Sequence, residues 1–189
     1  NSTDEGSVLD LSAGLGYPWK PLPFYELTVT PLGGYSYHEQ NFTITDGFQT
    51  IPATGPFADL DSEYQPRWRG PWVGVDLSFQ PASKWLFRGT FEYHWADYKA
   101  DARWNLRTDY SQPKSFRHTA DGHGIVGNVA LSYLLSERWS LHLNGAIQDW
   151  TTDAGIDRTF FSNGTAADTR LNEANWSSYS VSLGATYSF

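Results

Sequence analysis

Seven ionisable side chains lie in stretches where apolar and polar residues alternate, and each occupies the polar side of its stretch. Glu92 and His94 are two residues apart, which places a carboxylate beside an imidazole on one strand face. Such a pair could move a proton. Ionisable groups inside a small barrel more commonly pair into a polar plug, and a proton or solute path is the alternative. The expected inward-facing network comprises Asp10, Glu26, Asp76, Arg88, Glu92, His94 and His142.

A second group of potential ligands, His118, Asp121 and His123, has the residue types that bind transition metals. Alternating His and Asp in a predicted loop is an unspecific pattern, so we predict neither a metal site nor a cofactor. The chain contains no cysteine, which excludes disulfides and thiolate metal sites.

The strand that best shows how such residues are positioned is the last one. From Tyr179 to Phe189 every second residue is apolar, and the residues between are Ser, Gly or Thr. A period of two indicates a strand with two chemically opposite faces. A face of small polar side chains suits a crowded barrel interior, and an aromatic last residue is typical of the closing strand of a bacterial outer-membrane barrel.

The same alternation predicts six earlier strands, and the connections between strands alternate in length. Short turns are expected at 17–23, 80–84 and 135–138, and long loops at 45–62, 97–117 and 151–175. Outer-membrane barrels have short periplasmic turns and long extracellular loops. We therefore predict an all-β, antiparallel transmembrane barrel in the bacterial outer membrane, with a lipocalin-like soluble barrel as the alternative. The expected strands lie near 9–16, 24–44, 73–79, 85–95, 125–133, 139–148 and 179–189.

Composition agrees with a barrel in lipid. The 189 residues fit one domain over 1–189, and aromatic residues make up 16% of them, as expected for interfacial girdles. A net charge of −8 argues against a nucleic-acid partner. No run approaches the roughly 18 apolar residues of a membrane helix.

The number of predicted strands raises a question about closure. Seven is odd, whereas single-chain bacterial barrels have an even number of strands. With the short turns periplasmic, the first strand would start outside the cell and the last would end in the periplasm. We therefore expect additional N-terminal strands, or a partner chain, to be needed to close the barrel.

Three stretches resemble the omptin family, the ten-stranded outer-membrane proteases. They are E-L-T-V-T-P-L-G-G-Y-S-Y at 26–37, P-R-W-R-G-P-W-V-G-V-D-L-S-F followed by F-R-G-T-F-E-Y-H-W, and A-G-I-D followed at a distance by Y-S-V-S-L-G-A-T-Y-S-F. Their order and spacing match the seven C-terminal strands of that fold from about residue 8 to 189. The resemblance implies an omptin-like barrel without its N-terminal strands.

The resemblance also implies where catalytic groups should lie. Omptin catalysis uses an Asp-Asp pair from early strands, which falls outside this chain, and a facing Asp-x-His. The corresponding stretch contains Asp97, Asp101 and Arg103, with Arg in place of the histidine. Arginine is always protonated and cannot act as a base. We expect Arg103 to pair with Asp101 or Asp97, which leaves His94 as the substitute base.

Omptins also bind lipopolysaccharide phosphates through a basic and aromatic patch on the outer wall. Tyr35 and Arg69 match positions of that patch, but Glu39 stands where a basic residue is expected. The expected partners are therefore outer-membrane lipid and lipopolysaccharide.

Three functions remain open from the sequence. The first is a non-enzymatic omptin-like barrel that serves as a surface scaffold or a subunit of an envelope assembly. The second is an omptin-type endoprotease with part of its catalytic site upstream of residue 1. The third is a small-solute channel.

Overall fold

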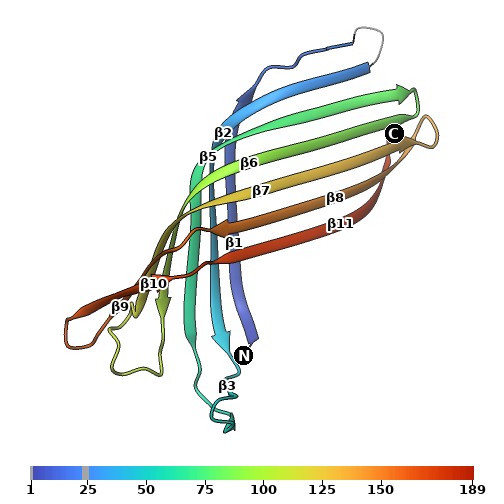
Figure 1. The fold of residues 1–189 in the computed structure, drawn as a ribbon. Coiled ribbons are helices and arrows are strands. Elements are labelled where there is room, and N and C mark those ends of the chain that lie inside the picture. The colour runs from blue at the N-terminus through green and yellow to red at the C-terminus, as the bar shows by residue number, and fades with distance from the viewer. Residues whose placement is uncertain (1, 23–25) are drawn as a thin grey trace.

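The computed structural model describes residues 2–22 and 26–189, and these form one large antiparallel sheet (Figure 1). Neighbouring strands follow the order β1-β2-β5-β6-β7-β8-β11, so each strand pairs with the next long strand of the chain. These long strands are β1 (Ser2–Gly16), β2 (Glu26–Thr45), β5 (Ser62–Ala82), β6 (Trp85–Arg103), β7 (Phe116–Leu134), β8 (Trp139–Thr152) and β11 (Asn175–Tyr187).

Four short strands lie in the long connections. A small hairpin of β3 (Phe48–Gln49) and β4 (Gly55–Pro56) follows β2, and a longer one of β9 (Gly155–Phe160) and β10 (Ala166–Leu171) extends β7. The long connections gather at one end of the sheet, and the short turns at the other (Figure 1). Helices are absent from the described residues, and so is any helical segment able to cross a membrane.

The predicted all-β antiparallel fold is confirmed, but several predicted strand ends are wrong. The stretch 97–117, predicted as a loop, is strand at both ends, because β6 continues to Arg103 and β7 begins at Phe116, and β5 begins at Ser62 rather than near Val73. The loop predicted at 151–175 contains the β9–β10 hairpin. In these extensions mostly charged residues occupy the outward positions that are apolar in the rest of each strand. The alternating pattern that identifies a membrane strand therefore disappears there, although the backbone hydrogen bonds between strands continue.

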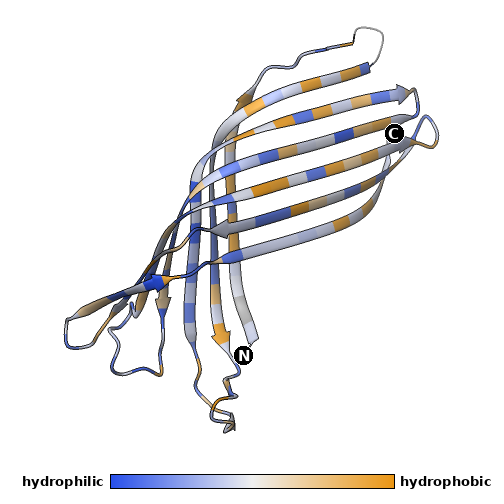
Figure 2. Ribbon diagram, viewed as in Figure 1, coloured by the Kyte–Doolittle hydropathy of each residue, from blue (hydrophilic) through white to orange (hydrophobic). Residues whose placement is uncertain are grey.

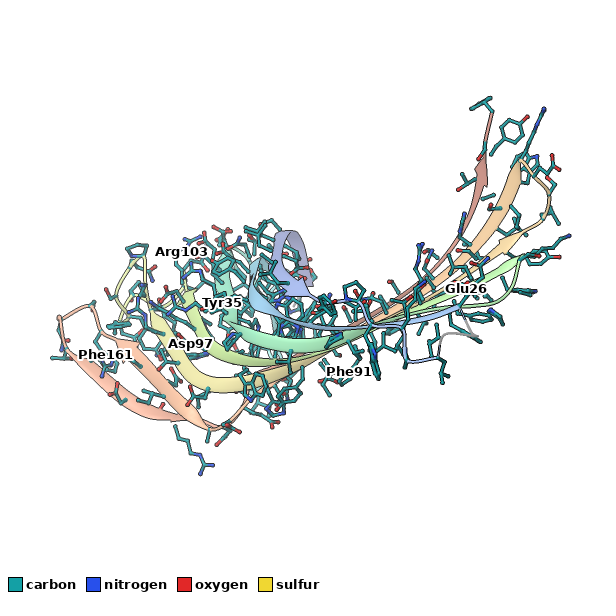
Figure 3. All side chains as sticks on the ribbon, turned by 90° about the horizontal axis from the view of Figure 1, so that it is seen from above. Glu26, Tyr35, Phe91, Asp97, Arg103 and Phe161 are labelled. Carbon is teal, nitrogen blue, oxygen red and sulfur yellow. The ribbon has the colours of Figure 1, made fainter. Side chains whose placement is uncertain are left out.

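Even-numbered and odd-numbered residues lie on opposite faces of the sheet. Strand partners such as His38 and Trp68, or Trp68 and Tyr98, lie side by side and point to the same face. This registration holds from β1, after its bulge, to β11, so even-numbered residues share one face, which we call the inner face. All buried residues within the strands are even-numbered. Figure 3 shows the sheet curved, with the odd-numbered Phe91 on its convex, outer side.

The outer face carries a belt of exposed apolar side chains toward the end with short turns. Figure 2 shows apolar and polar residues alternating along the strands there. On β6 the belt together with its aromatic margins runs from Trp85 to Trp95. Ten residues span about 33 Å of strand, or about 25 Å of height at the usual tilt, which matches the apolar band of outer-membrane barrels. The apolar belt consists of Val73, Leu77, Phe87, Phe91, Ile125, Val129, Leu141, Leu143, Ile147, Tyr179, Val181 and Leu183, all at least 40% exposed.

Aromatic side chains bound the apolar belt on both sides. At the end with short turns, the ring centroids of Trp85 and Tyr133 lie 4.5 Å apart, and those of Trp139 and Tyr187 lie 5.0 Å apart. At the other margin, Tyr93 packs edge-on against Trp95 at 5.0 Å. Amphipathic rings at these two levels form the girdles that anchor a barrel at the two membrane interfaces.

The inner face is packed around large aromatic residues beyond the apolar belt. Trp68, Tyr98 and Trp150 are almost completely buried, and their rings lie 4.4 to 5.7 Å apart. Gly124 makes room for this packing, because a Cβ atom added there would lie only 2.4 Å from the ring of Trp150. This end of the inner face is therefore a rigid aromatic core rather than an open channel.

The sheet is not closed. Within residues 2–22 and 26–189, β1 pairs only with β2 and β11 pairs only with β8, so each keeps one unpaired edge.

Candidate functional site

Two buried histidines, one on β2 and one on β6, form the centre of the polar inner face. His94 is 1% exposed, and its Nε2 lies 3.0 Å from Glu92 while its Nδ1 lies 3.0 Å from the Ser36 hydroxyl. His38 is 8% exposed, and its Nδ1 lies 2.8 Å from Asp10. Each imidazole is therefore oriented by a carboxylate, which accepts the hydrogen bond of the facing ring N–H.

The hydrogen bonds of His94 limit its chemistry. Its Nε2–H donates to Glu92, so its Nδ1 accepts the hydrogen bond of Ser36, and neither nitrogen is left for a substrate. A general base must reach the proton that it removes. His38 differs, because its Nε2 is buried without a hydrogen-bond partner. The two rings lie 5.9 Å apart, and both pack against Trp150.

The seven residues predicted to face inward all lie on the inner face, but they form separate groups. Asp10 pairs with His38, and Glu92 with His94, near the aromatic core. His142 lies toward the end with short turns, where Nδ1 is 3.0 Å from the Ser132 hydroxyl and Nε2 is 3.1 Å from that of Thr186. No described hydrogen bond or ion pair joins the remaining members, Glu26, Asp76 and Arg88, to the others.

The acidic residues of the omptin-like stretch lie on the opposite face of the sheet from His94. Asp97 and Asp101 are odd-numbered residues of the same strand, β6, and therefore point outward. Asp97 accepts two hydrogen bonds from Arg69, at 2.8 and 3.1 Å, and both side chains are more than half exposed. Since the side chains of Asp97 and Asp101 lie on the opposite face of the sheet from that of His94, these three residues do not form one site.

Asp101 is the centre of a cationic cluster. Its carboxylate lies 2.9 Å from Arg117, 3.1 Å from Lys114 and 3.5 Å from Arg67. Partial burial raises the pKa of this carboxyl, but the hydrogen bonds and charges of Arg117 and Lys114 outweigh that effect and hold its pKa below the ordinary value. Asp101 is therefore ionised at neutral pH and serves as a counter-ion.

Arg103 does not pair with Asp101 or Asp97, contrary to the expectation from the sequence. Its guanidinium lies 2.7 Å from Glu63 and 3.0 Å from Asp61, at the start of β5 and just before it. The antiparallel register explains this difference, because Glu63 is the direct cross-strand partner of Arg103. Arg103 thus links β6 to the connection that precedes β5.

The sequence pattern missed a hydrogen-bonded chain on the inner face near the long connections. The Tyr64 hydroxyl lies 2.6 Å from that of Tyr98 and 3.0 Å from Nδ1 of His118, and His118 Nε2 lies 3.5 Å from Asp157 of β9. Burial lowers the pKa of His118, with Asp157 acting in the opposite direction. The available signal was that Tyr64, Tyr98 and His118 are all even-numbered residues on three successive strands. That signal could be recognised only if the strands were extended into a stretch that the sequence predicted as a loop.

The potential metal ligands do not converge. His118 faces inward, whereas Asp121 and His123 face outward and line a separate surface recess. Across the described parts of the chain, no three His, Cys, Asp or Glu residues are grouped as a metal site requires.

The residues expected to contact lipopolysaccharide lie on the outer face just beyond the apolar belt. Tyr35 is 55% exposed, and the neighbouring Tyr37 is the cross-strand partner of Arg69. Glu39 accepts hydrogen bonds from Tyr37 and from Arg67, the latter at 3.2 Å. Arg69 and the nearby Arg67 therefore each have an acidic partner within the chain, Asp97 and Glu39 respectively.

Comparisons with known proteins agree with this geometry. A family model described as Pom, Protochlamydia outer membrane protein, matches residues 1–189. The crystal structure of the outer membrane protease OmpT from Escherichia coli matches with a TM-score of 0.69 and 16% sequence identity. The match covers 97% of this chain and 64% of that protease chain, so this chain spans less than two thirds of it. No curated protein matches. The predicted likeness to the omptin fold is thereby confirmed.

Proposed function

Because the chain belongs to the Protochlamydia outer membrane protein family and has an omptin-like fold in the bacterial outer membrane, we propose that it acts as a non-proteolytic surface scaffold or as a subunit of an envelope assembly. The observation that carries this proposal is the separation of the potential catalytic groups. Asp97 and Asp101 occupy the outer face with cationic partners, and His94 is buried on the inner face with both ring nitrogens engaged.

The chemistry of peptide hydrolysis supports the same conclusion. A water-activating site needs a neutral base that can reach the water and a carboxylate to orient that base. Arg103 offers only donors and is held by two carboxylates, so it cannot supply the missing base. Glu92 orients His94 suitably, but the ring is buried and both of its nitrogens are engaged, by Glu92 and by Ser36, so neither is available to take a proton from water.

We further propose that lipid contacts and additional strands complete the barrel. The apolar belt would be covered by lipid, and Tyr35 and Arg69 would contact lipopolysaccharide phosphates once Arg69 is released from Asp97. Unpaired backbone groups at the free edges of β1 and β11 would be costly in lipid. Strands from the same protein or from a partner chain would satisfy them.

The test is a cleavage assay with the complete protein in lipopolysaccharide-containing detergent, using a fluorogenic peptide with paired basic residues. We expect no cleavage by the wild type and none by Arg103→His, because residue 103 points away from His94. Cleavage that is lost in His94→Ala would overturn the proposal and identify His94 as the base. Cleavage that survives His94→Ala would overturn it as well and place the catalytic groups elsewhere.

The assembly part of the proposal is tested separately in native membranes. A cysteine placed on the outer edge of β1 or of β11 should form a specific crosslink to a neighbouring strand, of the same protein or of a partner. A cysteine at the exposed Thr169 of β10 serves as the control, because β10 lies outside the sheet path that would form the barrel. Equal crosslinking at all three places would refute a specific closing strand.

A further inference from the structure

Two adjoining grooves cross the outer face within the apolar belt, and we propose that together they bind one anionic glycerophospholipid of the periplasmic leaflet. The first groove, of about 570 Å³, is bordered by Trp85, Tyr133, Leu141 and Leu183. The second, of about 610 Å³, lies beside it on the same face. This inference rests on the lipid-covered belt of the proposed function, and it adds a defined site with a preferred headgroup.

The two grooves form one continuous depression. Leu131 of β7 and Leu143 of β8 are direct cross-strand partners, and both residues line both grooves. They are odd-numbered, so their side chains lie on the outer face. The depression begins at the aromatic girdle near the short turns, where Trp85 and Tyr133 lie, and continues into the apolar belt. This is the depth at which the acyl chain of a lipid in the periplasmic leaflet lies.

Two glycines deepen the depression. Gly89 of β6 and Gly145 of β8 flank Val129 of β7 in one row across the outer face. Both glycines line the second groove, and an added Cβ would meet no atom closer than 3.8 Å at Gly89 or 3.4 Å at Gly145. The protein therefore leaves this space unfilled. A hydrocarbon chain that fits into it gains dispersion contacts on several sides.

A cation stands at the headgroup end of the depression. The Arg138 guanidinium donates a hydrogen bond to the Tyr187 hydroxyl at 3.4 Å, and Tyr187 lies two residues beyond Ala185, which lines the first groove. The Tyr187 ring packs against Trp139 at 5.0 Å. Within residues 2–22 and 26–189, Arg138 forms no ion pair, unlike Arg69. Its remaining N–H groups can therefore donate to a phosphate.

A second cation borders the same end of the depression. Lys84 precedes the lining residue Trp85, and its carbonyl oxygen accepts a hydrogen bond from the Leu134 N–H at 2.8 Å. The acidic residue nearest in the chain to Arg138 is Glu137, so two cations stand beside one carboxylate. Basic residues at the membrane surface attract anionic lipid headgroups. The charge at this end therefore favours a lipid with a net negative headgroup.

The position and charge of the site distinguish among membrane lipids. The depression opens toward the short turns, which face the periplasm, whereas lipopolysaccharide lies at the other end of the belt beside the long connections. Phosphatidylcholine would bring its own fixed positive charge close to Arg138 and Lys84, and like charges repel. Phosphatidylglycerol offers a phosphate without a cation and two acyl chains, so it satisfies both parts of the site.

The test is native mass spectrometry of the complete protein in detergent, with dioleoyl phosphatidylglycerol, dioleoyl phosphatidylcholine and lipopolysaccharide as probes. We expect one phosphatidylglycerol to bind about tenfold more tightly than phosphatidylcholine. Arg138→Gln should reduce that affinity to the level of phosphatidylcholine, because it removes the charge at similar length. Gly145→Leu should weaken binding of both phospholipids by about tenfold, because the new side chain fills the depression.

Two matched controls separate this site from general effects. Arg88→Gln removes a positive charge from the inner face. Gly33→Leu adds the same side chain as Gly145→Leu on the outer face of β2, where an added Cβ would meet only the Trp72 carbonyl oxygen, at 3.8 Å. Neither control should change lipid binding. Heat-modifiable gel mobility establishes that each variant is folded.

Several outcomes would overturn the proposal. These are phosphatidylcholine binding at least as tight as that of phosphatidylglycerol, phosphatidylglycerol binding unchanged by Arg138→Gln or by Gly145→Leu, and tighter binding of lipopolysaccharide. A dimer that is lost in Gly145→Leu would overturn it by assigning the depression to a second copy of the chain. Absence of all lipid binding would overturn it too, and the lipid-covered belt would fall with it only if Val181→Arg folds as well as Ser182→Arg.

Discussion

The Asp101 cluster allows a quantitative test, because a second ion pair on the same strand provides a built-in comparison. Asp101→Asn removes the charge that three cations share, and Asp97→Asn removes the charge that only Arg69 contacts. Both substitutions preserve size and lie on the outer face of β6, beyond the apolar belt. Any difference between them therefore reports how far burial and the number of partners strengthen an ion pair.

The expected cost follows from the contacts. The Asp101 carboxylate is 17% exposed, and its hydrogen bond from Arg117 at 2.9 Å should contribute about 1.5 kcal/mol. Lys114 is more exposed and Arg67 is farther away, so together they add about 0.5 to 1 kcal/mol. Asp101→Asn should thus lower the free energy of unfolding by about 2 kcal/mol. The Asp97 pair is exposed on both sides, and its loss should be undetectable.

The assay is urea unfolding of the complete protein in lipid vesicles, followed by tryptophan fluorescence. The pKa of Asp101 is lowered in the folded protein, so its contribution is present above the unfolded-state pKa of about 3.9 and is lost as pH falls through the folded-state pKa. The gap between wild type and Asp101→Asn should therefore shrink under strongly acidic conditions. Equal effects of Asp101→Asn and Asp97→Asn at neutral pH would refute the reasoning.

Three further predictions concern the faces and the core. Val181→Arg should impair folding more than Ser182→Arg, because a charge on the lipid face costs about 2–4 kcal/mol near the midplane; heat-modifiable gel mobility measures the folded fraction, and equal yields would contradict the assignment. Gly124→Val should destabilise the protein by about 1–3 kcal/mol through overlap with the indole ring beside it. Gly184→Ala, which adds a Cβ with no atom within 4 Å, should be neutral in the same urea titration. Because burial lowers the pKa of His118, stability should fall as pH drops below about 6.5, and His118→Gln should flatten that part of the pH profile.

Sequence alternation predicted the strands well where one face meets lipid. Val181 and Ser182 are assigned to opposite faces by their types alone, and the register with β8 places them so. The prediction failed beyond Trp95, where Asp97 and Asp101 replace apolar residues on the outward positions. Beyond Trp95 charged residues alternate mainly with small ones, and this pattern also occurs in loops.

The partners of the candidate residues could not be predicted because they depend on register between strands. Arg103 lies two residues from Asp101, which made that pair the natural expectation. Instead, the β5–β6 register places Glu63 directly beside Arg103, and the β6–β7 register brings Arg117 beside Asp101.

The length of β6 has a consequence for how the membrane influences these charges. From Trp95, at the margin of the apolar belt, Asp101 is six residues farther along the strand, which corresponds to about 20 Å of strand and about 15 Å of height. The Debye length at physiological ionic strength is only about 8 Å. The surface potential of the lipid headgroups is therefore largely screened at this level. Changing the lipids from zwitterionic to anionic should leave the ionisation of Asp101 to its own neighbours, Arg117 and Lys114.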